Sequence, residues 1–403
     1  MPITDRERSQ FEMKRIALTI ERMRAYGRNI CEGVAAYAQE YAEDWALEFV
    51  DSRAVGGRGS YAGYDGAIVR VMDDRMAARL RALKRPVVDI FCKKIREGIV
   101  GVDADHIAIA KLAGRHFLTR KFTHFAFCGY DGIRYSDERR DAFVRYIRHN
   151  HYSCNCYRTP HGVLRSFDDD VIQNERVKLG ADAKQLKAWL RNLPKPCAVF
   201  CCHDLRAYQV IELCRQSGIS VPNEIAVLGV DDDHMLCSFT TPKISSIDPD
   251  AFAVGWAAAE TLDRLMKGEA VSPKHGFVSV PPKDIIVRAS TEVYPYDPPW
   301  ISDALVFIRK NVARSVNAAD VFEHLGLSHT VVERTFKKVL GSTIQREIMK
   351  ARVEEAQHLL LTTELPANEI GVRAGFKSSQ YFSRNFAAFT GCPPQAFRER
   401  KGR

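Results

Sequence analysis

The chain has 403 residues, 11 cysteines and a net charge of +9, and at roughly 150 residues per domain its length predicts two or three domains. It contains no run of about 18 apolar residues, and no apolar segment follows its charged start, MPITDRERSQFEMKR, so we expect a cytoplasmic protein without a membrane span or signal peptide. The cysteines form no CxxC pair, which favours reduced, mostly buried thiols over a metal or disulfide framework, and we expect no cofactor.

After a tail at 1–13, residues 14–290 alternate between apolar runs typical of strands and helical patterns. The predicted strands are Ile16 to Glu21, Gly66 to Val71, Pro86 to Phe91, Thr123 to Tyr130, Ala198 to Cys202, Ile225 to Asp231 and Ile285 to Ala289. The predicted helices are Asn29 to Tyr41, Arg75 to Leu83, His106 to Phe117, Asp137 to Asn150, Gln185 to Leu193, Leu205 to Gln216 and Ala251 to Lys267. Such alternation predicts parallel sheets covered by helices, here an α/β domain of two lobes that face a cleft.

Polar side chains follow several of these strands, where ligands bind in α/β sheets. The candidates for ligand contact are Glu21, Tyr26, Asp89, Arg139, His203, Asp204 and Asp231. Carboxylates that accept from hydroxyls, together with arginines that donate in pairs, suit a polyhydroxylated ligand such as a small sugar. A role as a helix cap or first-turn acid explains Asp204 about as well as ligand binding does.

The run Cys201, Cys202, His203, Asp204 raises the alternative of a catalytic site. Neighbouring side chains on a strand point to opposite faces, however, so a nucleophile and its base rarely come from adjacent residues. GxSxG, P-loop and HExxH motifs are absent as well. The sequence therefore predicts a binding protein rather than an enzyme.

Three prolines in TEVYPYDPPW predict an extended linker at residues 291–300. Strand patterns end there, and residues 301–403 form a second, all-α domain in the prediction. From Trp300 onward 16 Lys and Arg stand against 10 Asp and Glu, which gives +6 of the total charge of +9. This concentration of positive charge is expected of a domain that binds nucleic acid phosphates.

The all-α domain contains two predicted helix-turn-helix units. In the first, a helix at Asn317 to His324 is followed by a turn at Gly326 and a second helix capped by Ser328; the other unit turns at Gly375 and has its second helix capped by Ser378. Between them, Thr343 to Thr362 predicts one helix of about 30 Å, close to the roughly 34 Å between successive major grooves on one face of DNA. The outward side chains of the two second helices are His329, Thr330, Glu333, Arg334, Lys337, Ser379, Gln380, Ser383 and Arg384. We expect them to contact double-stranded DNA, although an ordinary helical hairpin remains an alternative for either unit alone.

Two family resemblances extend this interpretation. GFKSSQYFSRNFAAFTGCPPQAFR and LGLSHTVVERTFKKVLG resemble the two DNA-reading units of AraC/XylS regulators, which implies base contacts from the outward residues of both units. ERRDAF, HDLRA and GVDD resemble segments of the LacI/GalR sensor domain, which has the periplasmic-binding-protein fold, and imply sugar contacts at Arg139, His203 and Asp231. His203 and Val230 replace a frequent Asn and Tyr, so the sugar cannot be copied from a relative.

A LacI-like sensor followed by an AraC-type domain, with YGRNICEGVAAYA after the first strand, resembles regulators of xylose operons. The resemblance implies a transcription activator that responds to a small sugar, with a pentose such as xylose favoured, and that acts as a homodimer and contacts RNA polymerase. Sensing of another metabolite, repression instead of activation, and ligand-independent DNA binding by a dimer stay open as alternatives.

Overall fold

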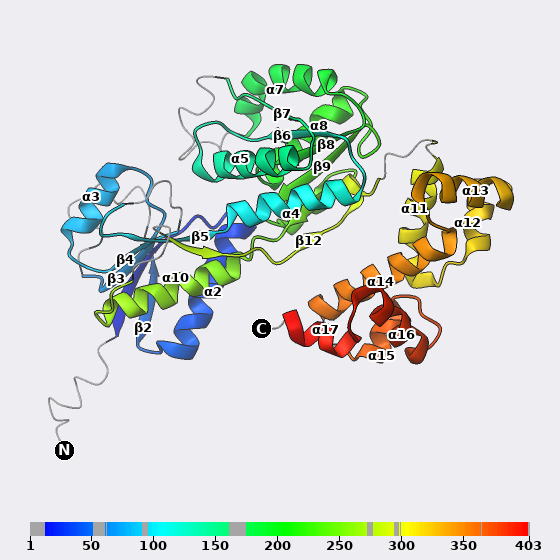
Figure 1. Ribbon diagram of the computed structural model, residues 1–403. Helices are drawn as coiled ribbons and strands as arrows, with labels where there is room; N and C mark the ends of the chain where they lie inside the picture. Colours follow the sequence, from blue (N-terminus) through cyan, green and yellow to red (C-terminus); the bar gives the residue numbers. More distant parts are fainter. Residues whose placement is uncertain are drawn as a thin grey trace. The chain divides into compact units, whose positions relative to one another are not determined.

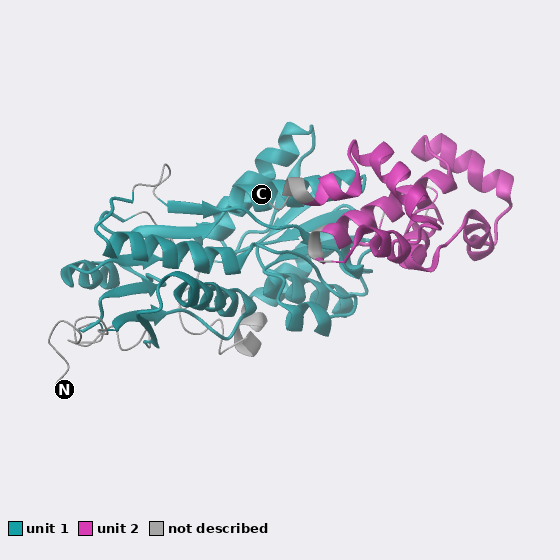
Figure 2. Cartoon of the chain, turned by 90° about the horizontal axis from the view of Figure 1, so that it is seen from below, with its two compact units in different colours: residues 1–291 teal, residues 292–403 magenta. Residues whose placement is uncertain are grey.

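The computed structural model describes residues 13–50, 61, 63–90, 96–160, 175–271, 277–293, 298, 300–363 and 365–401. The chain divides into two compact units, Met1–Thr291 and Glu292–Arg403, which Figure 2 shows in separate colours. Of the predicted tail only Met13 lies within the described residues, and of the predicted linker only residues 291–293, 298 and 300 do.

The first unit contains two six-stranded sheets, each flanked by helices (Figure 1). One sheet has the order β11-β5-β4-β3-β1-β2, and all of its pairs are parallel. Its strands are β1 Lys14–Thr19, β2 Trp45–Phe49, β3 Gly66–Val69, β4 Val87–Asp89, β5 Val100–Ala104 and β11 Phe277–Val280. Ile16, Ala17 and Leu18 of β1 and all of β3 are buried and apolar because helices cover both faces of such a sheet.

The other sheet has the order β12-β10-β9-β8-β6-β7, and only its edge strand β12 pairs antiparallel among the described residues. Its strands are β6 His124–Cys128, β7 Cys154–Cys156, β8 Cys197–Cys201, β9 Ile225–Val230, β10 Ser245–Ile247 and β12 Ile285–Ile286. The chain passes from one sheet to the other after β5, after β10 and after β11. Each sheet therefore belongs to a lobe built from separate stretches of sequence.

The helices of this unit lie between the strands in sequence. They are α2 Ala25–Tyr41, α3 Asp74–Ala82, α4 His106–Thr119, α5 Arg134–His149, α7 Glu175–Asn192, α8 Asp204–Gln216, α9 His234–Phe239, α10 Ala251–Met266 and the 3-10 turn η2 Ala289–Thr291. α10 follows β10 in sequence but packs on β3, β4 and β5 of the first sheet and against α2. The predicted α/β domain of two lobes is confirmed.

Five strands were not predicted, namely β2, β5, β7, β10 and β11. They are short, and several carry polar residues: VGVDA in β5 contains glycine and aspartate, and β7 is only the three residues CNC. Such segments form strands because a neighbouring strand supplies the pairing, which local sequence does not reveal.

The second unit is all-helical. Its elements are α11 Trp300–Asn311, the 3-10 turn η3 Val312–Arg314, α12 Ala318–Leu325, α13 His329–Leu340, α14 Ile344–Thr362, α15 Ala367–Arg373, α16 Ser379–Thr390 and α17 Pro394–Lys401. The first part of α14 packs with α11, α12 and α13 around Phe336, and its later part packs with α15 and α16 around Phe382 and Phe386. One helix therefore contributes to both hydrophobic cores and links the two helix-turn-helix units, as predicted.

Side-chain caps mark the starts of three helices of the second unit. The Asn317 side chain and Asp320 form a reciprocal capping box at α12, Thr343 caps α14, and Ser378 caps α16 by accepting from the Tyr381 amide. Ser328 occupies the N-cap position of α13, but its side chain makes no capping hydrogen bond, so that prediction was wrong in its detail.

A glycine forms the joint between the two helix-turn-helix units. Gly375 has a φ of +80°, and a Cβ at this position would lie 2.2 Å from the carbonyl oxygen of Val312 in η3. The Ser315 hydroxyl donates to the Gly375 carbonyl at 3.3 Å, and the buried Arg352 of α14 donates to the Val316 carbonyl at 2.9 Å. Only glycine allows both the backbone conformation and this close approach.

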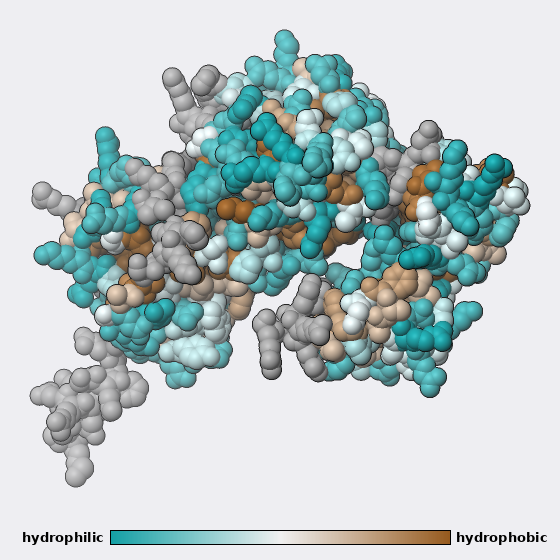
Figure 3. Space-filling model, in the orientation of Figure 1, coloured by the Kyte–Doolittle hydropathy of each residue, from teal (hydrophilic) through white to brown (hydrophobic). Residues whose placement is uncertain are grey.

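The face shown in Figure 3 is mostly hydrophilic, with hydrophobic residues in scattered groups. Within the described part of the chain, no helix is both long and apolar enough to cross a membrane. The ten cysteines that lie in the described ranges are free thiols.

Candidate functional site

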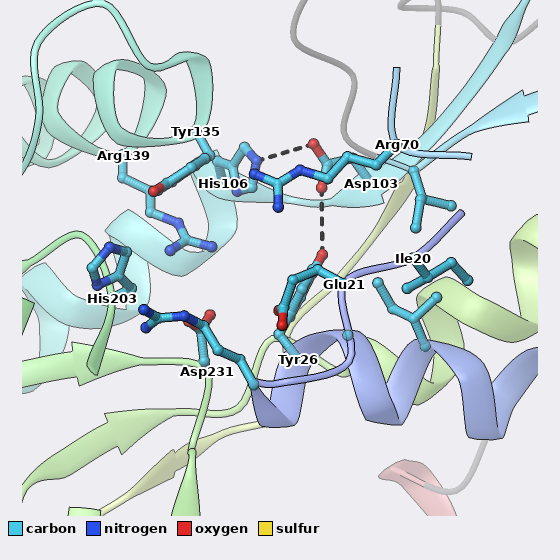
Figure 4. A pocket seen from close by; sticks show the side chains of 14 residues that line it. Ile20, Glu21, Tyr26, Arg70, Asp103, His106, Tyr135, Arg139, His203 and Asp231 are labelled. Carbon is cyan, nitrogen blue, oxygen red and sulfur yellow. Dashed lines mark hydrogen bonds and ion pairs between the residues drawn. The ribbon is translucent and has the colours of Figure 1, made fainter. Parts of the chain in front are cut away.

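A cavity of about 150 Å³ lies in the first unit, at the ends of strands from both sheets (Figure 4). The first sheet and α2 supply one wall, and residues that follow β8 and β9 or belong to α5 supply the other. The lining residues are Ile20, Glu21, Arg24, Tyr26, Gly27, Ile30, Arg70, Ile90, Asp103, His106, Tyr135, Arg139, His203 and Asp231. This is the position at which open α/β sheets bind ligands.

Of the seven predicted contact residues, the structure brings five together in this lining and places two elsewhere. The five are Glu21, Tyr26, Arg139, His203 and Asp231.

Asp89 lies behind the cavity wall. Its carboxylate accepts from the Val71 amide at 3.1 Å and from Arg96 at 3.3 Å. Val71 follows Arg70, so the Asp89 carboxylate holds the segment that carries Arg70 of the lining. The prediction that Asp89 itself contacts the ligand was wrong.

Asp204 is buried at the start of α8 and also lies outside the lining. It accepts from the Ser246 hydroxyl at 2.6 Å and from the Asp233 amide at 2.8 Å. Burial, followed by the nearby Asp231, holds its pKa well above the usual range. Through the Asp233 amide it holds the loop after β9, which also carries Asp231.

Five polar lining residues were missed by sequence reasoning: Arg24, Arg70, Asp103, His106 and Tyr135. Asp103 is the last but one residue of the unpredicted strand β5, where it contacts Arg134 at 2.9 Å and His106 at 3.2 Å. Burial raises the pKa of Asp103, but His106 and Arg134 outweigh burial and the pKa is lowered. A strand assignment for GIVGVDA would have identified it, because its position matches that of the other strand-end acids.

The loop after β1 approaches α2 closely. A Cβ at Gly27 would lie 1.6 Å from the carbonyl oxygen of Glu21, so only glycine fits at this point of the helix. The Glu21 carboxylate accepts from the Met23 amide and so stays in this loop. The close approach brings Glu21 and Tyr26 to the same wall of the cavity (Figure 4).

His203 is held in one tautomer. It occupies the N-cap of α8, where its Nδ1 accepts from the Arg206 amide at 3.0 Å, and its ring lies 5.7 Å from that of Tyr130 and 6.2 Å from that of Tyr135. Burial, followed by the charges of Arg24 and Arg139, holds the pKa of His203 well below its usual range. A neutral ring whose Nδ1 accepts carries its proton on Nε2, so His203 offers the cavity a donor.

Asp231 has an unusual backbone. Its φ is +110° and that of Asp232 is +46°, values that side-chain-bearing residues rarely adopt. The Asp231 amide donates to the Ile247 carbonyl at 3.0 Å, and the Asp232 amide donates to the Ser246 hydroxyl at 3.0 Å. Such strain persists where the surrounding structure imposes it, and it is common at binding sites.

Arg139 extends from α5 toward the space between His203 and Glu21 (Figure 4). Its side chain is buried, and it donates through Nη1 to the carbonyl of Cys202. Within the described part of the chain its buried Nε has no hydrogen-bond partner. An unsatisfied buried donor of this kind costs about 1–3 kcal/mol.

In the second unit, the predicted DNA contacts lie on α13 and α16. All nine side chains are exposed except that of Glu333, which is partly exposed. Val332 and Phe336 in α13, and Phe382 and Phe386 in α16, are buried on the opposite side. Both helices are therefore amphipathic, with the predicted residues outward.

Arg334 and Arg384 occupy equivalent places, since each lies six residues after the N-cap serine of its helix. The guanidinium of Arg384 lies 5.8 Å from the ring of Tyr381, which restricts it to the outer face of α16. An arginine at this place in each helix suits bidentate contact with guanine in a major groove.

The two folds define the class of protein. Residues 115–291 match the periplasmic binding protein-like domain, and residues 321–400 match a helix-turn-helix domain. The chain therefore combines a sensor domain of the periplasmic-binding-protein type with an AraC-type helix-turn-helix domain, which is the arrangement of a DNA-binding transcription regulator rather than of an enzyme.

Its full-length similarities are to xylose regulators. It is 26% identical to the xylose operon regulatory protein of Haemophilus influenzae over 95% of this chain and 98% of that one. The protein of the same name in Escherichia coli K12 is 27% identical over 96% and 97% of the two chains. A solved structure described as the xylose-binding transcription activator xylR aligns with a TM-score of 0.59 and 25% identity, over 96% of this chain and 97% of that one.

Proposed function

We propose that the protein is a cytoplasmic transcription activator that binds operator DNA as a homodimer under the control of a small sugar. The observation that carries this proposal is the cavity, in which Glu21, Arg139 and Asp231 reach one space from both sheets. Because the chain is similar to xylose regulators, a pentose such as xylose is the first candidate for the ligand.

The size of the cavity supports a single sugar ring. An engineered cavity of about 150 Å³ holds benzene, and the cavity here has about 150 Å³. The cavity is therefore on the scale of a single ring, and a disaccharide requires an enlarged cavity.

Sugar binding is expected to act by closing the two lobes. A ligand held by Glu21 on one side and by His203 and Asp231 on the other favours the closed arrangement by its differential affinity for the two states. In the proposed homodimer, closure of sensors spanning residues 14–290 changes the spacing of the DNA-binding domains at residues 301–403, through the linker at residues 291–300. Productive spacing then allows contact with RNA polymerase.

The test is a thermal-shift and calorimetric screen of pentoses, hexoses and their derivatives against the full chain. Asp231→Ala is expected to abolish the response to the best ligand while DNA binding is retained. Asp44→Ala serves as the control, because Asp44 is exposed and pairs with Lys14 away from the cavity. The proposal fails if no sugar or derivative binds, or if the Asp231 variant responds normally.

A further inference from the structure

The 3-10 turn η2, Ala289–Thr291, ends the first unit where the predicted linker begins, and we call it the linker root. Ser290 and Thr291 are polar but fully buried. The Ser290 amide donates to the Lys243 carbonyl at 2.9 Å, and the Ser290 hydroxyl donates to the Val227 carbonyl of β9 at 2.6 Å. Buried polar groups are costly unless they are hydrogen-bonded, so these contacts fix the linker root to the second sheet.

Thr291 is held by a chain of hydrogen bonds with a fixed direction. Nη1 of Arg120 donates to Nδ1 of His116 at 2.9 Å, so Nδ1 is an acceptor and the ring carries its proton on Nε2. Nε2 donates to the Thr291 hydroxyl at 3.0 Å, and this hydroxyl donates to the Ser245 hydroxyl of β10 at 2.8 Å. Arg120 also donates through Nε to the Thr291 carbonyl at 3.2 Å. His116 and Arg120 lie at the C-terminal end of α4, so this end of the helix is bonded directly to the linker root.

The other end of α4 lies at the cavity. His106 is the first residue of the helix, lines the cavity and contacts the Asp103 carboxylate at 3.2 Å (Figure 4). Asp103 belongs to β5 of the first sheet, so His106 lies where the chain crosses from one lobe to the other. His116 follows His106 by ten residues, which corresponds to about 15 Å along a helix. One helix therefore joins the cavity to the linker root (Figure 1).

The helices α4 and α5 pack tightly on each other. A Cβ at Gly114 of α4 would lie 2.3 Å from the ring of Tyr146 of α5. α5 also contributes Tyr135 and Arg139 to the cavity lining. Close-packed interiors deform little and so transmit displacements. A ligand that contacts His106 or the residues of α5 therefore acts on one packed pair of helices.

We infer that α4 couples the cavity to the linker root, with His116 and Arg120 as the positioning residues that pass its displacement to Thr291. The inference rests on the proposed function, in which a ligand closes the two lobes. Closure moves the first sheet relative to the second, and this movement reaches the first turn of α4 through the contact of Asp103 with His106. A shift of α4 moves Thr291, from which the chain continues to the DNA-binding domain.

This coupling is testable without a known sugar, because coupling between two sites is reciprocal and DNA binding must act back on the cavity end of α4. The Ile109 amide, which donates to the Asp105 carbonyl at 3.0 Å in the first turn, reports this effect through hydrogen exchange. The probe is the DNA site selected from random sequences with the wild-type full chain. We expect DNA to change exchange at Ile109 by about fivefold or more, beyond any change in α3, which contributes no residue to the cavity lining.

Variants of the linker root separate coupling from folding. Thr291→Val removes the hydroxyl and is expected to abolish the DNA-dependent change at Ile109 while the variant still binds the selected DNA, whereas Thr291→Ser is expected to retain the change. Thr119→Val is the matched control, because the Thr119 hydroxyl donates to the His116 carbonyl within α4 and not to the linker root. Arg120→Met removes the hydrogen bond to the Thr291 carbonyl from the side of α4 and is expected to cause the same loss, which covers the case that Thr291→Val does not fold.

A purely structural role of the linker root predicts another result. In that case Thr291→Val speeds exchange at Ser290 but leaves the DNA-dependent change at Ile109 intact. This result in Thr291→Val or in Arg120→Met overturns the inference, as does a wild-type chain in which DNA leaves exchange at Ile109 unchanged. The calorimetric sugar screen tests the proposed function separately. If no sugar binds but the change at Ile109 still requires Thr291, the proposed sugar control fails and the coupling through α4 stands.

Discussion

Replacement of Gly375 by alanine is expected to separate the two helix-turn-helix units. The new Cβ would lie 2.2 Å from the Val312 carbonyl oxygen, whereas even close carbon-oxygen contacts between backbones are about 3.3 Å long. The clash involves backbone on both sides, so the segment at η3 must move by about 1 Å. That segment packs with the first helix-turn-helix unit and Gly375 belongs to the second, so α13 and α16 shift relative to each other.

The magnitude has two parts. An alanine at a φ of +80° costs about 1–2 kcal/mol. Overpacking against fixed backbone adds about 1–3 kcal/mol. Gly375→Ala should therefore destabilise the helical unit by about 2–5 kcal/mol.

Gly391→Ala supplies the control. Gly391 has a φ of +79°, nearly that of Gly375, but no atom lies within 4 Å of the position that a Cβ would occupy, so alanine there suffers only the backbone cost. Hydrogen exchange of amides in α14 measures both effects in the full chain, since each 1.36 kcal/mol changes protection about tenfold.

DNA binding is measured on a site selected from random sequences with the wild-type protein. After correction for the folded fraction, Gly375→Ala should bind this site more weakly than Gly391→Ala, because its recognition helices no longer match adjacent grooves. Equal losses of protection and affinity in the two variants would refute the view that Gly375 fixes the joint.

Two further substitutions test single side chains. Arg384→Ala should weaken binding to the selected site by about 1–3 kcal/mol and relax specificity at one base pair. The control is Arg373→Ala, which should change neither quantity because Arg373 is exposed and pairs with Glu369. Unaltered specificity in repeated selections with Arg384→Ala would contradict a base contact. His203→Asn should retain ligand affinity within a few fold, because its amide can cap α8 and donate to the cavity, while His203→Ala should lose about 1 kcal/mol of stability with the cap as well as the ligand contact. Calorimetry that finds the Asn and Ala variants equally impaired would exclude the proposed tautomer.

Hydrophobic pattern alone predicted the two-lobed α/β architecture and the connector helix, because β8, β9 and α14 are long or uniformly apolar. β5 and β7 escaped prediction because their pairing partners, not their own residues, decide their conformation. The caps at Asn317 and Ser378 act locally and were therefore within reach of sequence reasoning.

The cavity was predictable only in part. Asp231 directly follows β9 and Glu21 lies two residues after β1, so a rule about strand ends identifies them. Asp89 obeys the same rule but is paired with Arg96 and the Val71 amide, a contact that depends on how the loops fold. Asp103 was not predicted as a lining residue because its strand, β5, was not predicted.

The most direct test of whether the sensor cavity controls DNA binding is a fluorescence-anisotropy titration. It measures the affinity of the full chain for its selected site with and without the best ligand of the screen. We predict a ligand-dependent change in affinity of about 5–150-fold, which corresponds to a coupling free energy of about 1–3 kcal/mol and disappears in Asp231→Ala. Identical affinities with and without a ligand that calorimetry shows to be bound would contradict the account.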